Sequence, residues 1–186
     1  LASSTLVSSS PVAQFVVGGS TFGIATYKIK TASAGTQATV RELRFTTTGT
    51  DAITSITVGG VTSPVVSGAA TVSGLNIVVS STGTDVPVTV KYSGFQNSTT
   101  GGSLQASIAS VSITLGYIEA TSGSGSVITD TPSVDSRTMS LVASKPTVSV
   151  SAGGTNALVL SAVAESKVGE FTVTADTNGK IAIAST

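Results

Sequence analysis

The chain of 186 residues contains no cysteine, no histidine and no tryptophan. Disulfide bonds are therefore excluded, and a zinc or other transition-metal site would lack its usual thiolate and imidazole ligands. Catalysis would have to rely on carboxylate, lysine, tyrosine or serine side chains. No motif combines these groups, so we predict that the protein is not an enzyme and that it holds no cofactor.

Charge is also scarce. Charged residues make up 10% of the chain, against a usual level of roughly 25%, and nine basic residues balance nine acidic ones. Nucleic-acid binding requires a basic surface, so we expect no nucleic-acid partner. No run of about 20 apolar residues exists, so we expect no membrane-spanning helix. A neutral surface keeps copies apart poorly, which favours self-association.

The residues that are present favour strands. Hydrophobic residues make up 40% of the chain, roughly a third is Ser or Thr, and Val, Ile and Thr suit half-buried pleated surfaces. Strong helix formers are few. We therefore predict an all-β protein. Serine and threonine in place of lysine and glutamate are typical of extracellular β proteins of microbes, which favours an extracellular location.

Several strands can be placed from the alternation of apolar residues. Residues 86–92 alternate most clearly, and Gly59-Gly60 indicates a tight hairpin turn. The apolar residues occupy even positions at 38 and 40 but odd positions at 43 and 45. This change of parity predicts either a β-bulge or two strands with a kink. Residues 116–125 are predicted to form a loop, with an edge pairing near 117–119 as the alternative.

Two distant segments of the sequence resemble each other. Residues 6–11 read LVSSSP and are followed by Gly18-Gly19, while residues 141–146 read LVASKP and are followed by Gly153-Gly154. The offset is about 135 positions, which predicts a tandem repeat. Residues 1–10 are then the last strand of a preceding module or a donor strand, residues 11–145 form one module, and residues 146–186 open a second one.

Two alignments of the later part of this second module compete. One matches residues 40–43 with 168–171, and the other matches residues 27–29 and Gly35 with 171–173 and Gly179. We prefer the second because its turn glycines agree, although it requires a small insertion after Gly154. On either alignment the second module is incomplete within the chain.

An incomplete sandwich would expose both an apolar face and unpaired strand edges. Either the following residues of a longer protein complete this module, or another copy does. Strand addition from another copy would cover these features and would join molecules head to tail. A contact of this kind builds an open filament unless the rotation closes it. The residues predicted to form the assembly interface are Leu6, Val7, Phe171, Val173, Ile181 and Ile183.

Two weaker site predictions concern ions and sugars. Asp130 and Asp135 lie in one loop and are candidate calcium ligands, because calcium takes oxygen ligands; the alternative is an ordinary proline turn. Asn97 begins the glycosylation sequence Asn-Ser-Thr. The charged residues Arg41, Glu42 and Arg44 are expected to face Lys28 and Lys30 on a neighbouring strand.

Residues 141–150, which read LVASKPTVSV, and residues 171–176, which read FTVTAD, resemble repeats of large surface proteins of uncultivated bacteria. They are similar in general style to sandwich domains of S-layers and surface filaments. The resemblance implies an extracellular location and a structural role. Together with the strand pattern, it indicates immunoglobulin-like β-sandwich modules in tandem.

The leading functional prediction is a structural subunit of a cell-surface filament, pilus or S-layer, built by joining sandwich modules end to end with the same protein as partner. The alternative is an adhesin or a carbohydrate-binding module of a large secreted protein. That alternative predicts glycan binding through exposed aromatic residues such as Phe95 or Tyr117.

Overall fold

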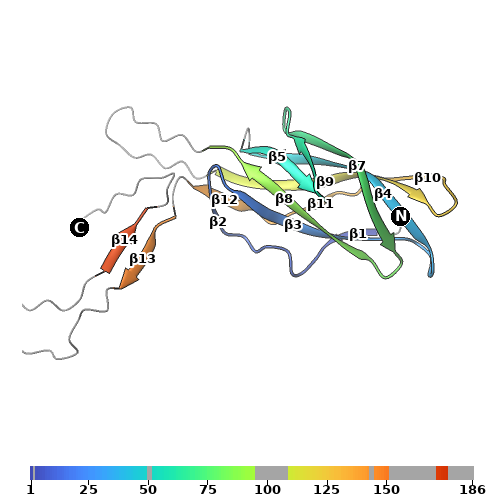
Figure 1. The fold of residues 1–186 in the computed structure, drawn as a ribbon, viewed down its shortest axis with the longest axis horizontal. Coiled ribbons are helices and arrows are strands. Elements are labelled where there is room, and N and C mark those ends of the chain that lie inside the picture. The colour runs from blue at the N-terminus through green and yellow to red at the C-terminus, as the bar shows by residue number, and fades with distance from the viewer. Residues whose placement is uncertain (2, 50–51, 95–108, 143–144, 151–170, 176–186) are drawn as a thin grey trace, which may run out of the picture.

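A computed structural model describes residues 1, 3–49, 52–94, 109–142, 145–150 and 171–175. The described residues form strands and turns without helices, as the composition predicts. Two sheets enclose one apolar core, and a separate two-stranded ribbon follows near the end of the chain (Figure 1). The chain is therefore an all-β protein with the layers of a β-sandwich.

The first sheet has five strands in the spatial order β1-β3-β8-β5-β6. All neighbouring strands in it are antiparallel. Their bounds are β1 Ser3–Leu6, β3 Thr21–Lys30, β5 Ile53–Val58, β6 Val61–Pro64 and β8 Thr84–Tyr92.

The second sheet has the spatial order β2-β12-β9-β4-β7, and two short strands, β10 and β11, extend its edge along β9. Its only parallel pair joins β2 to β12. The bounds are β2 Phe15–Val17, β4 Gln37–Thr48, β7 Ala69–Ser80, β9 Ala109–Ser122, β10 Val127–Asp130, β11 Val134–Asp135 and β12 Met139–Val142.

The core lies between the facing sides of the two sheets. Tyr27 of the first sheet packs against Phe45 of the second, with ring centroids 6.2 Å apart. Val86, Val88, Val90 and Tyr92 of β8 are all buried, which confirms the alternation predicted for this strand. No charged side chain is among the buried residues of the described part, so apolar burial holds the sheets together.

The parity change predicted after residue 40 is a β-bulge, and the kinked pair of strands is not formed. β4 is continuous, and its pairing with both β7 and β9 shifts between Val40 and Glu42. The extra residue, Arg41, lets Val40 and Leu43 both point into the core. Gly59 and Gly60 both have positive φ in the β5–β6 hairpin, as the predicted tight turn requires.

The prediction of a loop over residues 116–125 is wrong for most of that range. β9 continues to Ser122 and pairs with β4 on one side and β10 on the other. A register shift at Gly116 reverses the parity, so Leu115 and Ile118 are both fully buried. A bulge hides the alternation of a strand from sequence inspection, because apolar residues then stand three positions apart.

The first strand of the chain belongs to the same sandwich as the strands that follow it. β1 pairs with β3 from Ser3↔Lys30 to Leu6↔Tyr27, and Leu6 packs against the core. This arrangement differs from the expected module boundary between residues 10 and 11, because β1 and β2 both contribute to one sandwich. The chain crosses from the first sheet to the second between these two strands.

The ribbon near the end of the chain consists of β13 (Thr147–Val150) and β14 (Phe171–Thr174). Among the described strands, each pairs only with the other. Val148, Val150 and Phe171 are 62%, 80% and 66% exposed, unlike the apolar residues of the sandwich. Figure 1 draws this ribbon beyond the end of the sandwich at which β2 and β12 lie.

Two tyrosines of the core have buried hydroxyl groups. The hydroxyls of Tyr27 and Tyr92 have no hydrogen-bond partner among the described residues. Burial raises the pKa of Tyr92 to about 12, and burial together with the nearby charge of Asp135 raises the pKa of Tyr27 further. The neutral phenol is therefore strongly preferred in the folded state.

We predict that the folded state loses stability in alkali because of these two groups. An unfolded tyrosine ionises near its ordinary pKa of 10.0, whereas Tyr92 ionises at about 12 in the folded protein. The contribution of Tyr92 is therefore complete below pH 10 and is lost as the pH rises to about 12. Chemical denaturation of the wild type at a series of pH values should show this fall in the free energy of unfolding.

The matched variant is Tyr27→Phe/Tyr92→Phe. It removes two unpaired hydroxyls, so its stability at pH 7 should be close to that of the wild type. It should retain more of that stability above pH 10. An equal alkaline loss in the variant and the wild type would contradict the assignment to these residues.

Candidate functional site

The edge formed by β1 is the best candidate for an assembly site. β1 has four residues, pairs with β3 through four register positions and has no strand on its other side in the first sheet. It also contacts β11 of the second sheet. Of the predicted interface residues, Leu6 packs partly buried against the core and the backbone N–H of Val7 donates to the carbonyl of Thr26 at 2.9 Å.

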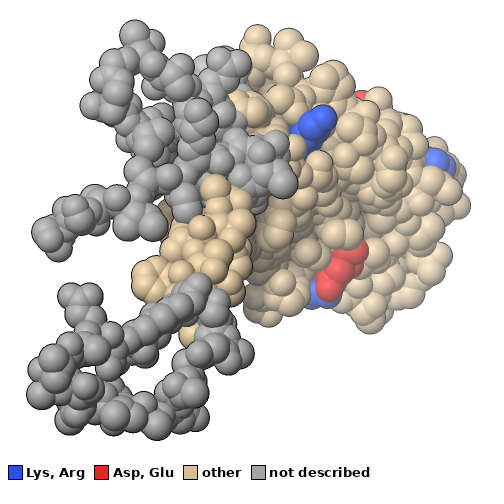
Figure 2. Space-filling model, turned by 60° about the vertical axis from the view of Figure 1, so that its left-hand side comes forward, with Lys and Arg blue, Asp and Glu red and all other residues tan. Residues whose placement is uncertain are grey.

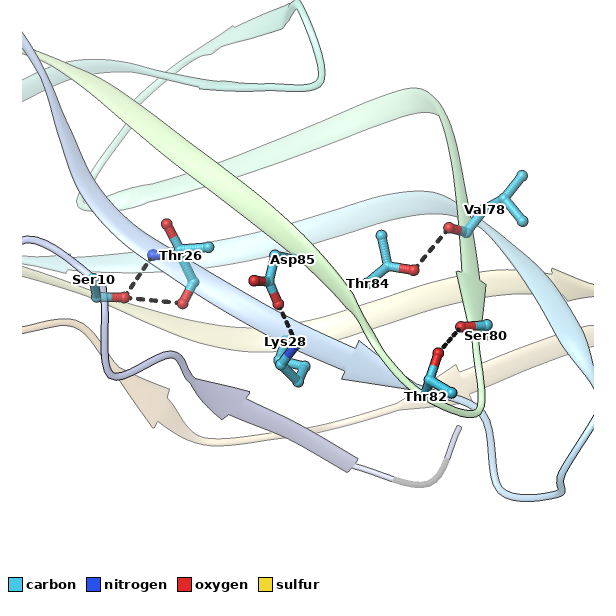
Figure 3. A network of polar contacts seen from close by, with 8 residues as sticks. All are labelled: Ser10, Thr26, Lys28, Val78, Ser80, Thr82, Thr84 and Asp85. Atoms are coloured by element: carbon cyan, nitrogen blue, oxygen red, sulfur yellow. Dashed lines mark hydrogen bonds and ion pairs between the residues drawn. The ribbon is translucent and has the colours of Figure 1, made fainter.

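Ser10 fastens the segment that follows β1. Its Oγ accepts a hydrogen bond from the backbone N–H of Thr26 at 2.8 Å and donates to the carbonyl oxygen of Thr26 at 3.0 Å (Figure 3). Ser10 is 3% exposed, Pro11 is partly buried, and Val12 and Ala13 after it are exposed. The attachment of β1 therefore ends at Ser10, and an exposed connection leads from there to β2.

Lysines of the first sheet do not face the charged residues of β4, so that prediction is wrong. The neighbours of β3 are β1 and β8, and Lys28 forms an ion pair with Asp85 of β8 (Figure 3). Both side chains are partly exposed, so the pair adds little stability. The parity of the strands was read correctly, but a sequence does not reveal which strands share a sheet.

Most side-chain hydrogen bonds at the surface of the described part involve hydroxyl groups. In the turn between β7 and β8, Thr84 donates to the carbonyl of Val78 and the hydroxyls of Ser80 and Thr82 bond each other (Figure 3). Figure 2 shows one face of the molecule on which charged side chains are few and scattered. Hydroxyls both donate and accept, so they satisfy a surface without adding charge.

The two calcium candidates lie apart. Asp130 is opposite Ile118 and Asp135 is opposite Thr114, so they are four residues apart along β9, or roughly 13 Å. Each carboxylate has a local partner: Asp130 accepts from the backbone N–H of Thr131, and Asp135 accepts from the hydroxyl of Thr114. No group of three or more acidic residues that could hold a metal occurs within the described ranges.

Sequence inspection missed a polar cluster on the outer face of the second sheet. The guanidinium of Arg44 lies 4.3 Å from the ring centre of Tyr117, and its Nε donates to Glu42 at 2.7 Å. The hydroxyl of Tyr117 donates to Glu119 at 3.3 Å. The bulge at Gly116 turns Tyr117 to this face, which is why the pattern did not reveal the cluster.

Charge and desolvation shift the pKa values within this cluster. The hydrogen bond from Arg44 to Glu42 is the main cause that raises the pKa of Arg44. Desolvation, followed by the hydrogen bond to Glu119, raises the pKa of Tyr117. The cluster therefore contains a permanent cation and a neutral phenol at physiological pH beside the carboxyl groups of Glu42 and Glu119, a set of groups that can bind polar ligands.

The remaining predicted site residues fall into two groups. Phe171 and Val173 lie on β14, and Phe171 is largely exposed. Ile181, Ile183, Asn97 and Phe95 lie outside the described residues. Within the part of the chain that the structure describes, no helix is long and apolar enough to cross a membrane.

No family model, curated protein or solved structure matches the chain.

We predict that Ser10→Ala loosens the first strand. The substitution removes the partner of the Thr26 N–H, which is partly buried, and should lower the free energy of unfolding by about 1–3 kcal/mol. Urea denaturation measures this loss. Hydrogen exchange should also speed up at the amide of Val7, whose bond to Thr26 lies beside the lost one.

Ser9→Ala is the matched control, because Ser9 is exposed and next in sequence. It should leave both the stability and the exchange at Val7 unchanged. Equal effects of the two substitutions would show that Ser10 does not fasten the strand.

Proposed function

We propose that the protein is a non-enzymatic structural subunit of an extracellular cell-surface assembly, joined head to tail with other copies by donation of β1. The observation that carries this proposal is the attachment of β1. Four register positions and the Ser10 contacts hold it to β3, and an exposed connection separates it from β2. A short edge strand of this kind is among the elements that open most easily.

Exchange of β1 between copies would replace the contacts within one chain by the same contacts between two chains. The donated strand would pair with β3 of the neighbouring copy through the register seen within one chain, so the same contacts would form. With the Val7 and Ser10 contacts also formed on the neighbouring copy, residues 11–14 are the connection, which reaches up to roughly 14 Å when extended, at about 3.4 Å per residue. Each copy would give one strand and accept one, which produces an open chain of subunits.

The module is proposed to be immunoglobulin-like. In that architecture one sheet has the order A-B-E-D and the other contains C-F-G. The order β1-β3-β8-β5 corresponds to the first and β12-β9-β4 to the second. One difference concerns the order along the chain. In variable-type immunoglobulin domains the strand that pairs with strand C directly follows it, whereas here β5 and β6 of the first sheet come between β4 and its partner β7.

The surface composition supports an assembly outside the cell. Nine positive charges balance nine negative ones, so copies experience little net repulsion. Many polar contacts of the surface join hydroxyls to backbone carbonyls or to each other, and such neutral contacts depend little on ionic strength. The likeness of residues 141–150 to bacterial surface repeats points in the same direction.

A disulfide trap tests strand donation. Ser3 and Lys30 stand opposite each other on the outward side of β1 and β3, and the chain has no other cysteine. Oxidation of assembled Ser3→Cys/Lys30→Cys protein should give a ladder of covalent multimers on a non-reducing denaturing gel. Oxidation before assembly should lock β1 within its own molecule and prevent polymer formation.

Ser3→Cys alone serves as the control, because it can form at most dimers. Assembled double-cysteine protein that yields only monomers on the gel would contradict strand donation. Polymer formation at the normal level by protein that was locked first would contradict it as well.

A second candidate function is a glycan-binding or adhesin module, which the cluster around Tyr117 favours. Arg44, Glu42 and Glu119 surround an aromatic ring on an otherwise charge-poor outer face. If this cluster binds sugars, glycan-array binding should be lost in Tyr117→Ala and retained in Phe22→Ala, which removes an exposed aromatic residue elsewhere. Equal binding by both variants, or none by the wild type, would count against this function.

A further inference from the structure

The pairing of β13 with β14 repeats the pairing of β1 with β3. Leu6 is opposite Tyr27, and Val150 is opposite Phe171. Both pairs are 21 positions apart (27 − 6 = 21 and 171 − 150 = 21). Each of the four register positions in one ribbon corresponds to one in the other after a constant shift of 144 positions (171 − 27 = 144).

The same shift superimposes the apolar faces of the two ribbons. Tyr27 and Ile29 correspond to Phe171 and Val173, and Leu6 corresponds to Val150. Tyr27 and Ile29 are fully buried beneath the second sheet of the sandwich. Their counterparts therefore lie on what would be the inner face of a second sandwich.

Two positions beyond the ribbon agree with this shift, whereas Ile181 and Ile183 correspond to the polar residues Gln37 and Thr39. Without any insertion, Gly35 corresponds to Gly179 and Ala38 to Ala182. Gly35 has a φ of 75°, a conformation that favours glycine. The offset of about 135 positions seen near Pro11 and Pro146 corresponds to no equivalent strand pair, because β12, the counterpart of β1 at that offset, pairs with β9 and β2.

We infer that β13 and β14 are the first strand pair of a second sandwich, and that the apolar face of Val148, Val150, Phe171 and Val173 binds a β-sheet of the same kind as the second sheet of the first sandwich. The repeating unit then begins with β1 and not at Pro11. The expected partner presents an apolar face like that of the second sheet, because Tyr27 packs there against Phe45 and both Tyr27 and Ile29 are fully buried.

The chemistry of the ribbon fits such a partner. Its four apolar side chains form two directly opposed pairs, Val150↔Phe171 and Val148↔Val173, as on the inner face of a sandwich. Two strands alone are marginal in water, and a second sheet at about 10 Å is the usual cover for such a face. Threonines and a serine occupy the intervening positions, as expected for the outer side.

The test extends the chain with its own sequence. Residues 43–142 are appended after Thr186, which continues the second unit at the shift of 144 positions. The comparison protein carries residues 52–142 instead, which continues it at the offset of 135. Both contain Phe171→Trp, and because the chain has no other tryptophan the emission reports only on this face.

The first extension should shift the tryptophan emission to the blue and protect it from acrylamide, relative to the unextended Phe171→Trp chain. Hydrogen exchange at the amides of β14 should slow in parallel, which gives a second readout if tryptophan disturbs packing. Adding Val150→Ser to the first extension should reduce both effects, whereas Ser149→Ala, on the opposite side of β13, should not.

Three results would overturn the inference: no change with the first extension, an equal change with both extensions, or a concentration-dependent blue shift of the unextended chain, which would indicate that a second copy covers the face. The measurement uses protein with β1 locked by the Ser3→Cys/Lys30→Cys disulfide. Strand donation is thereby prevented, so the outcome is independent of the proposed assembly.

Discussion

A sheet that is apolar on one face is stable in water only when another apolar surface covers that face. In the sandwich this condition is met by β3 and β8 on one side and by β4 and β9 on the other, with Tyr27 against Phe45 near the centre. The bulges at Arg41 and Gly116 serve the same condition, because each keeps apolar residues on the inner face after the strand has turned. The ribbon of β13 and β14 has such a face and, among the described residues, no sheet over it.

The second constraint concerns edges. The first sheet ends at β1 and β6, and the second ends at β7 on one side and at β2, β10 and β11 on the other. Natural proteins often protect sheet edges with charged residues, but only 10% of the residues in this chain are charged. β1 occupies the edge of β3 through only four register positions, and for this reason we propose that edge as the place where one copy joins the next. Architecture and proposed function thus rest on the same short strand.

The sequence correctly predicted an all-β protein and several of its regular strands. β8 and the glycine hairpin between β5 and β6 follow from local patterns, because alternation and positive φ are properties of neighbouring residues. The strand after Gly116 was missed because a bulge broke its alternation. The pairing of β1 with β3 could not be derived, since partners 21 positions apart leave no local signal.

The sequence predicted only part of the candidate site. Leu6 and Val7 were identified from a repeated motif, but the motif suggested a different phase from the one that the strand pairs support. The hydrogen bonds of Ser10 to Thr26 and the contact of Arg44 with the ring of Tyr117 join residues that are far apart in the chain. Such contacts become visible only once the sheets are in place.

Electron cryomicroscopy of assembled protein, at a resolution that traces residues 7–14, tests the central claim most directly. Strand donation predicts continuous density that leaves β2 of one subunit and enters β1 on β3 of the next. Density that returns to β3 of the same subunit in every copy, or a preparation of isolated particles at high concentration, would contradict it.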